Sequence, residues 1–180
     1  MMKNKRGEEM EKSQEEKQVF YGEFIFGNET FDNDININSI EGLFFALIDV
    51  HQLLLKTIDV GSLEYKSLSN IKNCMIFAIN NEEAIFDQKS SVEKRLTITI
   101  NLVPNNNKLA LNKKYDGLES DFTTQEIFQI FTLLMRIIKD MYISVYMGNS
   151  VQDLINMDKS VLNEIVIDCI YDVLKEFINL

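Results

Sequence analysis

Hydrophobic and polar residues alternate along two stretches of this chain, and each alternation predicts a β-strand. In 19–26, VFYGEFIF, Phe20, Phe24 and Phe26 fall on one face at a period of two. The clearest strand is 94–103, KRLTITINLV, where apolar residues occupy every second position. Such a strand buries one face and exposes the other, which is typical of an antiparallel sheet.

Shorter stretches rich in apolar, β-branched and aromatic residues predict further strands. They lie at 62–68, 73–79, 82–87 and 108–111. Asn80 and Asn81 separate two of them and predict a two-residue hairpin turn, because Asn tolerates positive φ. The segment 27–39 is rich in Asn and Asp, and it predicts a loop.

Three longer stretches repeat apolar residues every three or four positions, which is typical of amphipathic helices. They lie at 40–58, 124–147 and 159–178. Asn38 and Glu41 predict a capping box for the first, and Thr123 and Glu126 predict one for the second. The second helix is apolar almost all round, so we expect it to be mostly buried.

The last of these helices separates apolar from acidic residues. The apolar set expected to face the core is Leu162, Ile165, Cys169, Val173 and Phe177. The acidic set expected to face solvent is Glu164, Asp168, Asp172 and Glu176. The acidic residues recur every four positions and therefore form one line along the helix.

The order of these elements predicts the fold class. Strand-like and helix-like stretches do not alternate in the regular manner of a parallel α/β sheet. We expect a single α+β domain with a mostly antiparallel sheet of about five strands, covered by the three main helices. Residues 1–18 are charged and lack an apolar stripe, so they predict a disordered tail, and 19–180 form the domain.

The net charge of the chain limits the kinds of partner that it is expected to bind. The formal net charge is −10, and the acidic and basic residues of 1–18 cancel, so 19–180 hold the whole excess. This charge opposes binding to nucleic acid or to an anionic membrane, and it favours a basic protein partner. Acidity that only keeps the protein soluble is the alternative. Without an apolar leader or a transmembrane stretch, the sequence favours a cytoplasmic protein.

His51 is the only histidine, and it is the first residue to consider for catalysis. It lies on the same helical stripe as Leu47 and Leu54, and no second histidine is available for a metal site. Cys74 and Cys169 sit among apolar neighbours, so we expect buried, reduced thiols. These patterns predict a core histidine and no catalytic residue.

Two segments resemble metal sites only in part. Asp32, Asp34 and Asn36 begin like a calcium loop, but Ile37 and Leu43 stand where that loop needs Gly and Glu. A weaker cation site made from these oxygens stays open. Glu64 and Lys66 form the E-x-K pair that some metal-dependent nucleases use, yet the acidic domain would repel such a substrate. We predict no metal and no cofactor.

The absence of several well-known sequence motifs argues against further classes of enzyme and nucleotide-binding protein. The seven glycines never form GxG, so neither a P-loop nor a dinucleotide fingerprint is present, and there is no GxSxG. The sequence favours a small, non-catalytic inhibitor or an immunity- or antitoxin-type binder, with the acidic line Glu164, Asp168, Asp172 and Glu176 as its partner-binding candidates. A carboxylate-based, metal-dependent hydrolase, a chaperone-like or structural subunit, and a homodimer stay open.

Overall fold

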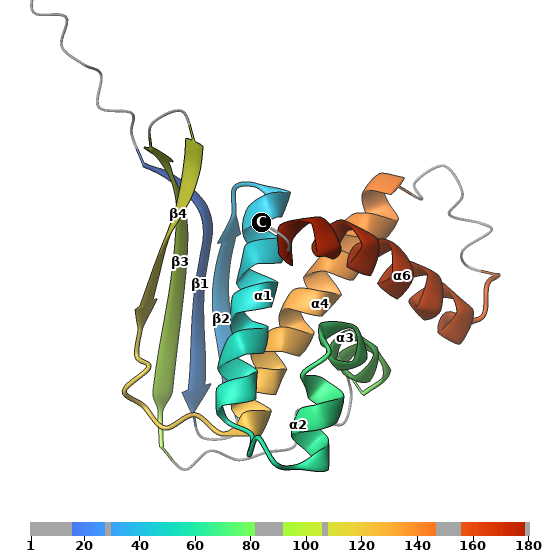
Figure 1. Cartoon of the computed structure of the whole chain (residues 1–180), viewed down its shortest axis with the longest axis horizontal. Helices are drawn as coiled ribbons and strands as arrows, with labels where there is room; N and C mark the ends of the chain where they lie inside the picture. Colours follow the sequence, from blue (N-terminus) through green and yellow to red (C-terminus); the bar gives the residue numbers. More distant parts are fainter. Residues whose placement is uncertain (1–15, 28–29, 82–91, 106–107, 147–155, 179–180) are drawn as a thin grey trace, which may run out of the picture.

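The computed structural model describes residues 16–27, 30–81, 92–105, 108–146 and 156–178. Its strands are β1 (Lys17–Gly27), β2 (Thr30–Ile37), β3 (Lys94–Asn105) and β4 (Lys108–Asp116). Its helices are α1 (Ile40–Lys56), α2 (Leu63–Leu68), α3 (Ile71–Asn80), α4 (Thr124–Tyr146) and α6 (Lys159–Ile178). Figure 1 shows the sheet on one side of the molecule and the helices gathered against one of its faces.

The sheet has the order β2-β1-β3-β4, and every pairing is antiparallel. Phe20 pairs with Ile100 and Phe24 with Leu96, so apolar side chains of the two central strands lie together on the helix side. The predicted antiparallel α+β fold is therefore confirmed. Four strands lie in the described ranges instead of about five, and the strand predicted at 82–87 falls outside those ranges.

The predicted strands at 62–68 and 73–79 are wrong, because these segments form α2 and α3. Ser62 and Asn70 are the N-caps, and their side chains accept hydrogen bonds from the backbone N–H of Tyr65 and Lys72. The buried residues of α3 follow helical spacing: Ile71, Cys74, Met75, Ala78 and Ile79. Asn80 ends α3, so the predicted hairpin turn does not exist.

The predicted loop at 27–39 is also wrong, because most of it is the edge strand β2. Phe31, Ile35 and Ile37 lie at period two and pack against the core, while Asp32 and Asp34 on the other face are exposed. The polar composition concealed this alternation. Pairing with β1, which the sequence does not reveal locally, supplies the backbone hydrogen bonds of β2.

The first helix begins at Ile40 as predicted, but Ser39 caps it instead of Asn38. The Ser39 hydroxyl accepts a hydrogen bond from Gly42 N at 3.2 Å. Asn38 is engaged elsewhere, because its side-chain amide donates to Gln18 O on β1 at 3.1 Å. The cap therefore shifts by one residue toward the helix.

The capping box predicted for α4 is confirmed in both directions. Thr123 N donates to Glu126 Oε1 at 2.9 Å, and Glu126 N donates to Thr123 Oγ1 at 3.2 Å. Lys94 of β3 adds an ion pair to Glu126 Oε1 at 2.8 Å. The predicted burial of this helix is confirmed as well, because its central turns pack in the core.

The bounds of the last helix are confirmed at Lys159–Ile178, but its predicted inward face is only partly correct: Leu162 and Phe177 pack against the core as predicted. The buried residues are Asn163, Val166, Ile167, Ile170 and Leu174. Ile165 and Val173, which we expected in the core, are exposed. The helix has apolar residues on two faces, and its packing against α1, α3 and α4 buries one of them.

The disordered tail predicted at 1–18 is wrong at its end, because Lys17 and Gln18 belong to β1. Residues 1–15 lie outside the described ranges.

Candidate functional site

The predicted acidic residues of the last helix all lie at the surface. Glu164, Asp168, Asp172 and Glu176 are exposed, and successive members are about 6 Å apart along the helix axis. Among the described residues, ion pairs engage only the middle two. Asp168 Oδ1 lies 2.9 Å from Lys72 Nζ on α3, and Asp172 Oδ1 lies 3.0 Å from Lys175 Nζ.

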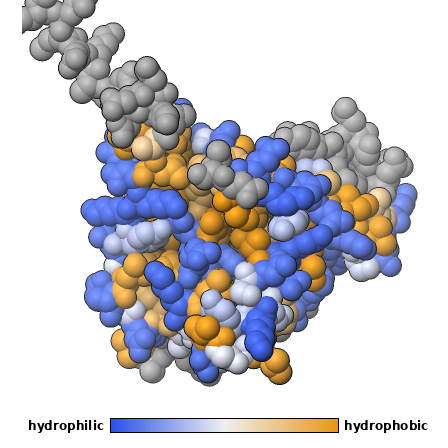
Figure 2. Space-filling model, viewed as in Figure 1, coloured by the Kyte–Doolittle hydropathy of each residue, from blue (hydrophilic) through white to orange (hydrophobic). Residues whose placement is uncertain are grey.

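An apolar row runs beside this acidic row. Val161, Ile165 and Val173 are 45%, 37% and 41% exposed, and the half-buried Cys169 continues their four-residue spacing. Each of these residues precedes one acidic residue by three positions, and residues so spaced are neighbours on a helix surface. We call the two rows together the α6 face. Figure 2 shows hydrophobic and hydrophilic side chains interleaved on the side of the molecule where α6 lies.

The charges of the α6 face are only partly compensated. The Lys72–Asp168 and Lys175–Asp172 pairs are solvent-accessible, and exposed pairs contribute little to stability. Glu164 and Glu176 have no ion pair within the part of the chain that the structure describes. Hydrogen bonding to Asp168 raises the pKa of Lys72 above its ordinary value, so this amine is charged at neutral pH. The face therefore keeps a negative character.

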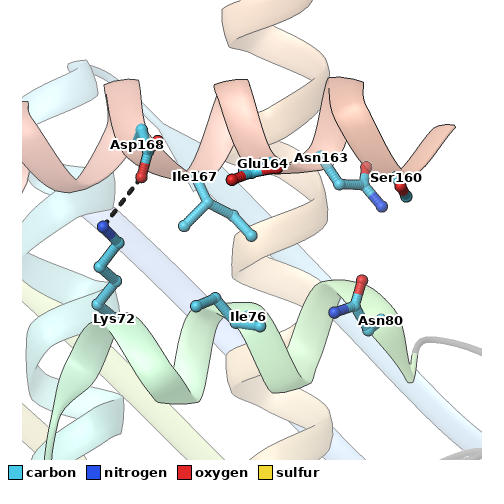
Figure 3. A pocket seen from close by; sticks show the side chains of 8 residues that line it. All are labelled: Lys72, Ile76, Asn80, Ser160, Asn163, Glu164, Ile167 and Asp168. Atoms are coloured by element: carbon cyan, nitrogen blue, oxygen red, sulfur yellow. Dashed lines mark ion pairs between the residues drawn. The ribbon is translucent and has the colours of Figure 1, made fainter. Parts of the chain in front are cut away.

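A groove of about 330 Å³ opens between α3 and α6. Figure 3 shows its walls: the Lys72–Asp168 pair closes one end, the apolar side chains meet across the middle, and amide and hydroxyl groups stand at the other end. The lining residues of α3 are Lys72, Ile76 and Asn80. Those of α6 are Ser160, Asn163, Glu164, Ile167 and Asp168. Two of the four predicted carboxylates thus belong to this groove, and Asp172 and Glu176 do not.

Asn163 is the buried polar residue of the groove. It is 5% exposed, and its Oδ1 has no hydrogen-bond partner among the residues that the structure describes. Figure 3 shows its side chain directed from α6 toward the end of α3. Buried polar atoms are normally paired, because an unpaired one loses hydration without compensation. Sequence analysis missed this residue, since a single Asn in a helix gives no signal of burial.

The structure places His51 in the core, which confirms its predicted burial. It is 3% exposed, and its Nε2 lies 2.7 Å from Leu68 O at the end of α2. Its ring centroid is 6.2 Å from that of Phe131. Burial lowers the pKa of His51 below its ordinary value, so the ring is neutral at physiological pH. This geometry joins two helices and presents no imidazole to a substrate.

The buried thiol of Cys74 is unsuited to nucleophilic chemistry. Cys74 and Cys169 are both free, as predicted, but Cys169 is only half-buried. Burial raises the pKa of the Cys74 thiol to about 12. A cysteine nucleophile acts as the thiolate, which needs a lowered pKa and access to solvent. Cys74 has neither.

The structure places the residues of both partial metal motifs. No group of three or more His, Cys, Asp or Glu side chains that could hold a metal occurs in the described ranges, where Asp32 and Asp34 lie on the edge strand β2. Glu64 and Lys66 lie on the short helix α2 instead of a strand. Residues two apart on a helix do not face each other, so the E-x-K geometry is lost.

One partly buried ionic cluster, centred on the buried Asp49, escaped sequence analysis. Asp49 of α1 accepts hydrogen bonds from Lys113 Nζ and from Tyr115 OH, both at 2.7 Å. Burial and the bond to Asp49 raise the pKa of Tyr115 above its ordinary value, so the phenol stays protonated and donates. The cluster ties the edge strand β4 to α1. Its partners are far apart in sequence, so no local pattern reveals it.

Known proteins offer no further guidance to this site. Comparison with protein families, with curated proteins and with solved structures found no match. Within the described ranges, no helix has the length and hydrophobicity needed to span a membrane.

Proposed function

We propose that this protein is a non-catalytic, acidic interaction protein that binds a basic protein partner through the α6 face. The observation that supports this most is the pair of parallel rows on α6. An acidic row, Glu164 to Glu176, runs beside a row in which Val161, Ile165 and Val173 are exposed. A merely solvated helix face gains nothing from aligned apolar side chains.

The two rows supply different parts of a binding energy. Apolar surface that a partner removes from water contributes about 25 cal/mol per Å². Carboxylates at four-residue spacing repel one another by a few tenths of a kcal/mol per pair, and a cationic partner relieves that repulsion. The formal net charge of −10 adds long-range attraction, which raises the rate of encounter with a basic protein.

The partner chemistry follows from this pattern. A complementary surface has a row of Lys or Arg beside a row of aliphatic side chains, as one face of an amphipathic helix provides. An inhibitor or an immunity- or antitoxin-type protein acting on a basic enzyme has the matching charge. No catalytic role is part of this proposal, because His51 is buried and bonded to Leu68 O and the Cys74 thiol stays protonated.

The test compares two charge reversals of equal size. One variant is Asp168→Lys with Asp172→Lys on the α6 face, and the control is Asp32→Lys with Asp34→Lys on the opposite side of the sheet. Proteins captured from the native cell by the wild type are identified by mass spectrometry. The partner is then purified, and its association rate with all three chains is measured at several ionic strengths.

We expect the α6 variant to bind more slowly and with a flatter salt dependence, while the control follows the wild type more closely. Circular dichroism verifies that both variants are folded. Equal association kinetics for the α6 variant and the wild type at every ionic strength contradict the proposal. A captured partner with an acidic surface contradicts it as well.

A further inference from the structure

We infer that the groove between α3 and α6 is a pocket for one arginine side chain of the partner. This inference rests on the proposed function and names the partner's anchor. Three features of the groove support it: its size, its one uncompensated charge, and the buried amide of Asn163. Each restricts the occupant in a different way.

Size excludes a large occupant. Ligand pockets range from about 300 to 1,000 Å³, and this groove has about 330 Å³. One long side chain fits such a space, and a helix or strand does not. Ile76 and Ile167 face each other across its middle (Figure 3), so the occupant needs an apolar stem there. The aliphatic part of an arginine or lysine side chain provides one.

Charge selects a single cation. Lys72 pairs with Asp168 at 2.9 Å at one end of the groove, and this pair is internally neutral. Glu164 lines the middle and has no ion pair among the described residues. The groove therefore holds one uncompensated negative charge. A monocation compensates it, whereas an anionic occupant adds repulsion.

The polar end selects a guanidinium group over an ammonium group. Asn80, Ser160 and Asn163 stand together at this end, and the Asn163 amide has an unpaired oxygen. Rotation of that amide can present its carbonyl to a donor in the groove. A guanidinium has five N–H donors in a planar fork, so it can reach Glu164 and the amide together. An ammonium is a compact point charge and satisfies fewer of these acceptors at once.

The probe is the capped tripeptide Ac-Ala-Arg-Ala-NH₂, titrated into the full ¹⁵N-labelled chain at about 0.15 M salt. Two-dimensional NMR follows the backbone amides of α3 and α6 and the side-chain amide of Asn163. We expect saturable shifts confined to these signals, with a dissociation constant of order 1–10 mM. Ac-Ala-Lys-Ala-NH₂ should bind more weakly, and the uncharged citrulline tripeptide should not bind.

Three variants separate a pocket from non-specific attraction to an acidic protein. Glu164→Gln keeps the shape of the side chain and removes its charge, so arginine affinity should fall about tenfold. Asn163→Leu replaces an amide whose oxygen has no partner among the described residues, so the melting temperature should hold or rise while arginine binding is lost. Glu119→Gln removes the same charge from an exposed residue outside both the groove and the α6 face, and it should leave the titration unchanged.

Equal binding of the arginine and lysine probes overturns the assignment of arginine. Unsaturable shifts, or unchanged binding in a folded Asn163→Leu variant, overturn the pocket itself. These outcomes are distinct from those of the charge-reversal experiment, because the probe needs no partner protein. A partner that depends on the α6 face while the probe fails leaves the proposed function standing without the arginine anchor.

Discussion

His51 Nε2 on α1 lies 2.7 Å from the backbone oxygen of Leu68, the last residue of α2. The ring is almost fully enclosed, and burial lowers its pKa from the ordinary 6.5. The imidazole therefore acts as a neutral donor that joins two helices. Because the buried ring disfavours the charged form, protonation of His51 opposes folding.

Acid should weaken the fold through His51. The folded chain binds fewer protons than the unfolded chain once the pH falls to about 6.5, so the free energy of unfolding decreases from there downward. The slope for one group is at most about 1.4 kcal/mol per pH unit. His51→Gln places an amide near the position of Nε2 and removes the titration. The difference in unfolding free energy between wild type and variant should be constant above pH ~7.5 and shift in favour of the variant below it.

Urea unfolding at several pH values measures that difference. Carboxylates titrate in both chains and cancel in the comparison, so the result isolates the histidine. Parallel stability curves for the two chains between about pH 5 and 7 would show that His51 is not the group responsible.

The Asp49 cluster should contribute more to stability than an exposed ion pair. Asp49→Asn removes the charge that holds Lys113 and Tyr115 at 2.7 Å, and the free energy of unfolding should fall by about 1–3 kcal/mol. Lys113 is partly exposed and can turn to solvent, so the loss stays below that of a fully buried pair. Denaturant titration measures it.

Asp116→Asn is the matched control on the same edge strand. Asp116 is exposed and lies 3.7 Å from Lys114, which is also exposed. This pair should contribute less than about 1 kcal/mol. Equal losses for the two variants would mean that the Asp49 cluster acts as a surface pair.

Local signals predicted those parts of the fold that a few neighbouring residues decide. The alternation in 94–103 and the capping box of Thr123 and Glu126 each act within one element, and the structure has both. The edge strand β2 was missed because its Asn and Asp residues are typical of loops. Its strand conformation depends on hydrogen bonds to β1, and the sequence gives no sign of that pairing.

The candidate site likewise combines features that neighbouring residues decide with features that depend on long-range packing. The acidic row of α6 follows from its four-residue spacing, so the sequence suffices to identify it. The apolar row beside it does not, because Ile165 and Val173 were expected in the core. The groove needs α3 to be a helix, and ten residues with this apolar content also suit a strand. The unpaired amide of Asn163 emerges only from packing.

The capping box at the start of α4 should contribute measurably to the free energy of unfolding. Thr123→Ala removes the hydroxyl that accepts from Glu126 N, and the free energy of unfolding should decrease by about 1 kcal/mol. Gln125→Ala changes an exposed residue of the same first turn, so it should stay within about 0.5 kcal/mol of the wild type. Chemical denaturation of the three chains measures both. A Thr123→Ala loss no larger than that of Gln125→Ala would show that Glu126 and Lys94 hold this helix end without the hydroxyl.

Gly42 should tolerate no side chain, because α1 packs there directly on the backbone of β1. A Cβ at Gly42 would overlap Val19 O and lie 2.6 Å from the carbonyl carbon. The same Val19 oxygen accepts from Asn38 N at 3.1 Å, so the helix start and the strand cannot separate without losing this bond. Gly42→Ala should therefore lower the free energy of unfolding by about 1–3 kcal/mol or more. Gly61→Ala is the control: its nearest contact is Asp59 Oδ1 at 4.0 Å, and the substitution should be neutral or stabilise by up to about 1 kcal/mol. Thermal and urea unfolding measure the stability of both variants. A Gly42→Ala chain as stable as the Gly61→Ala chain would rule out the close approach of α1 to β1.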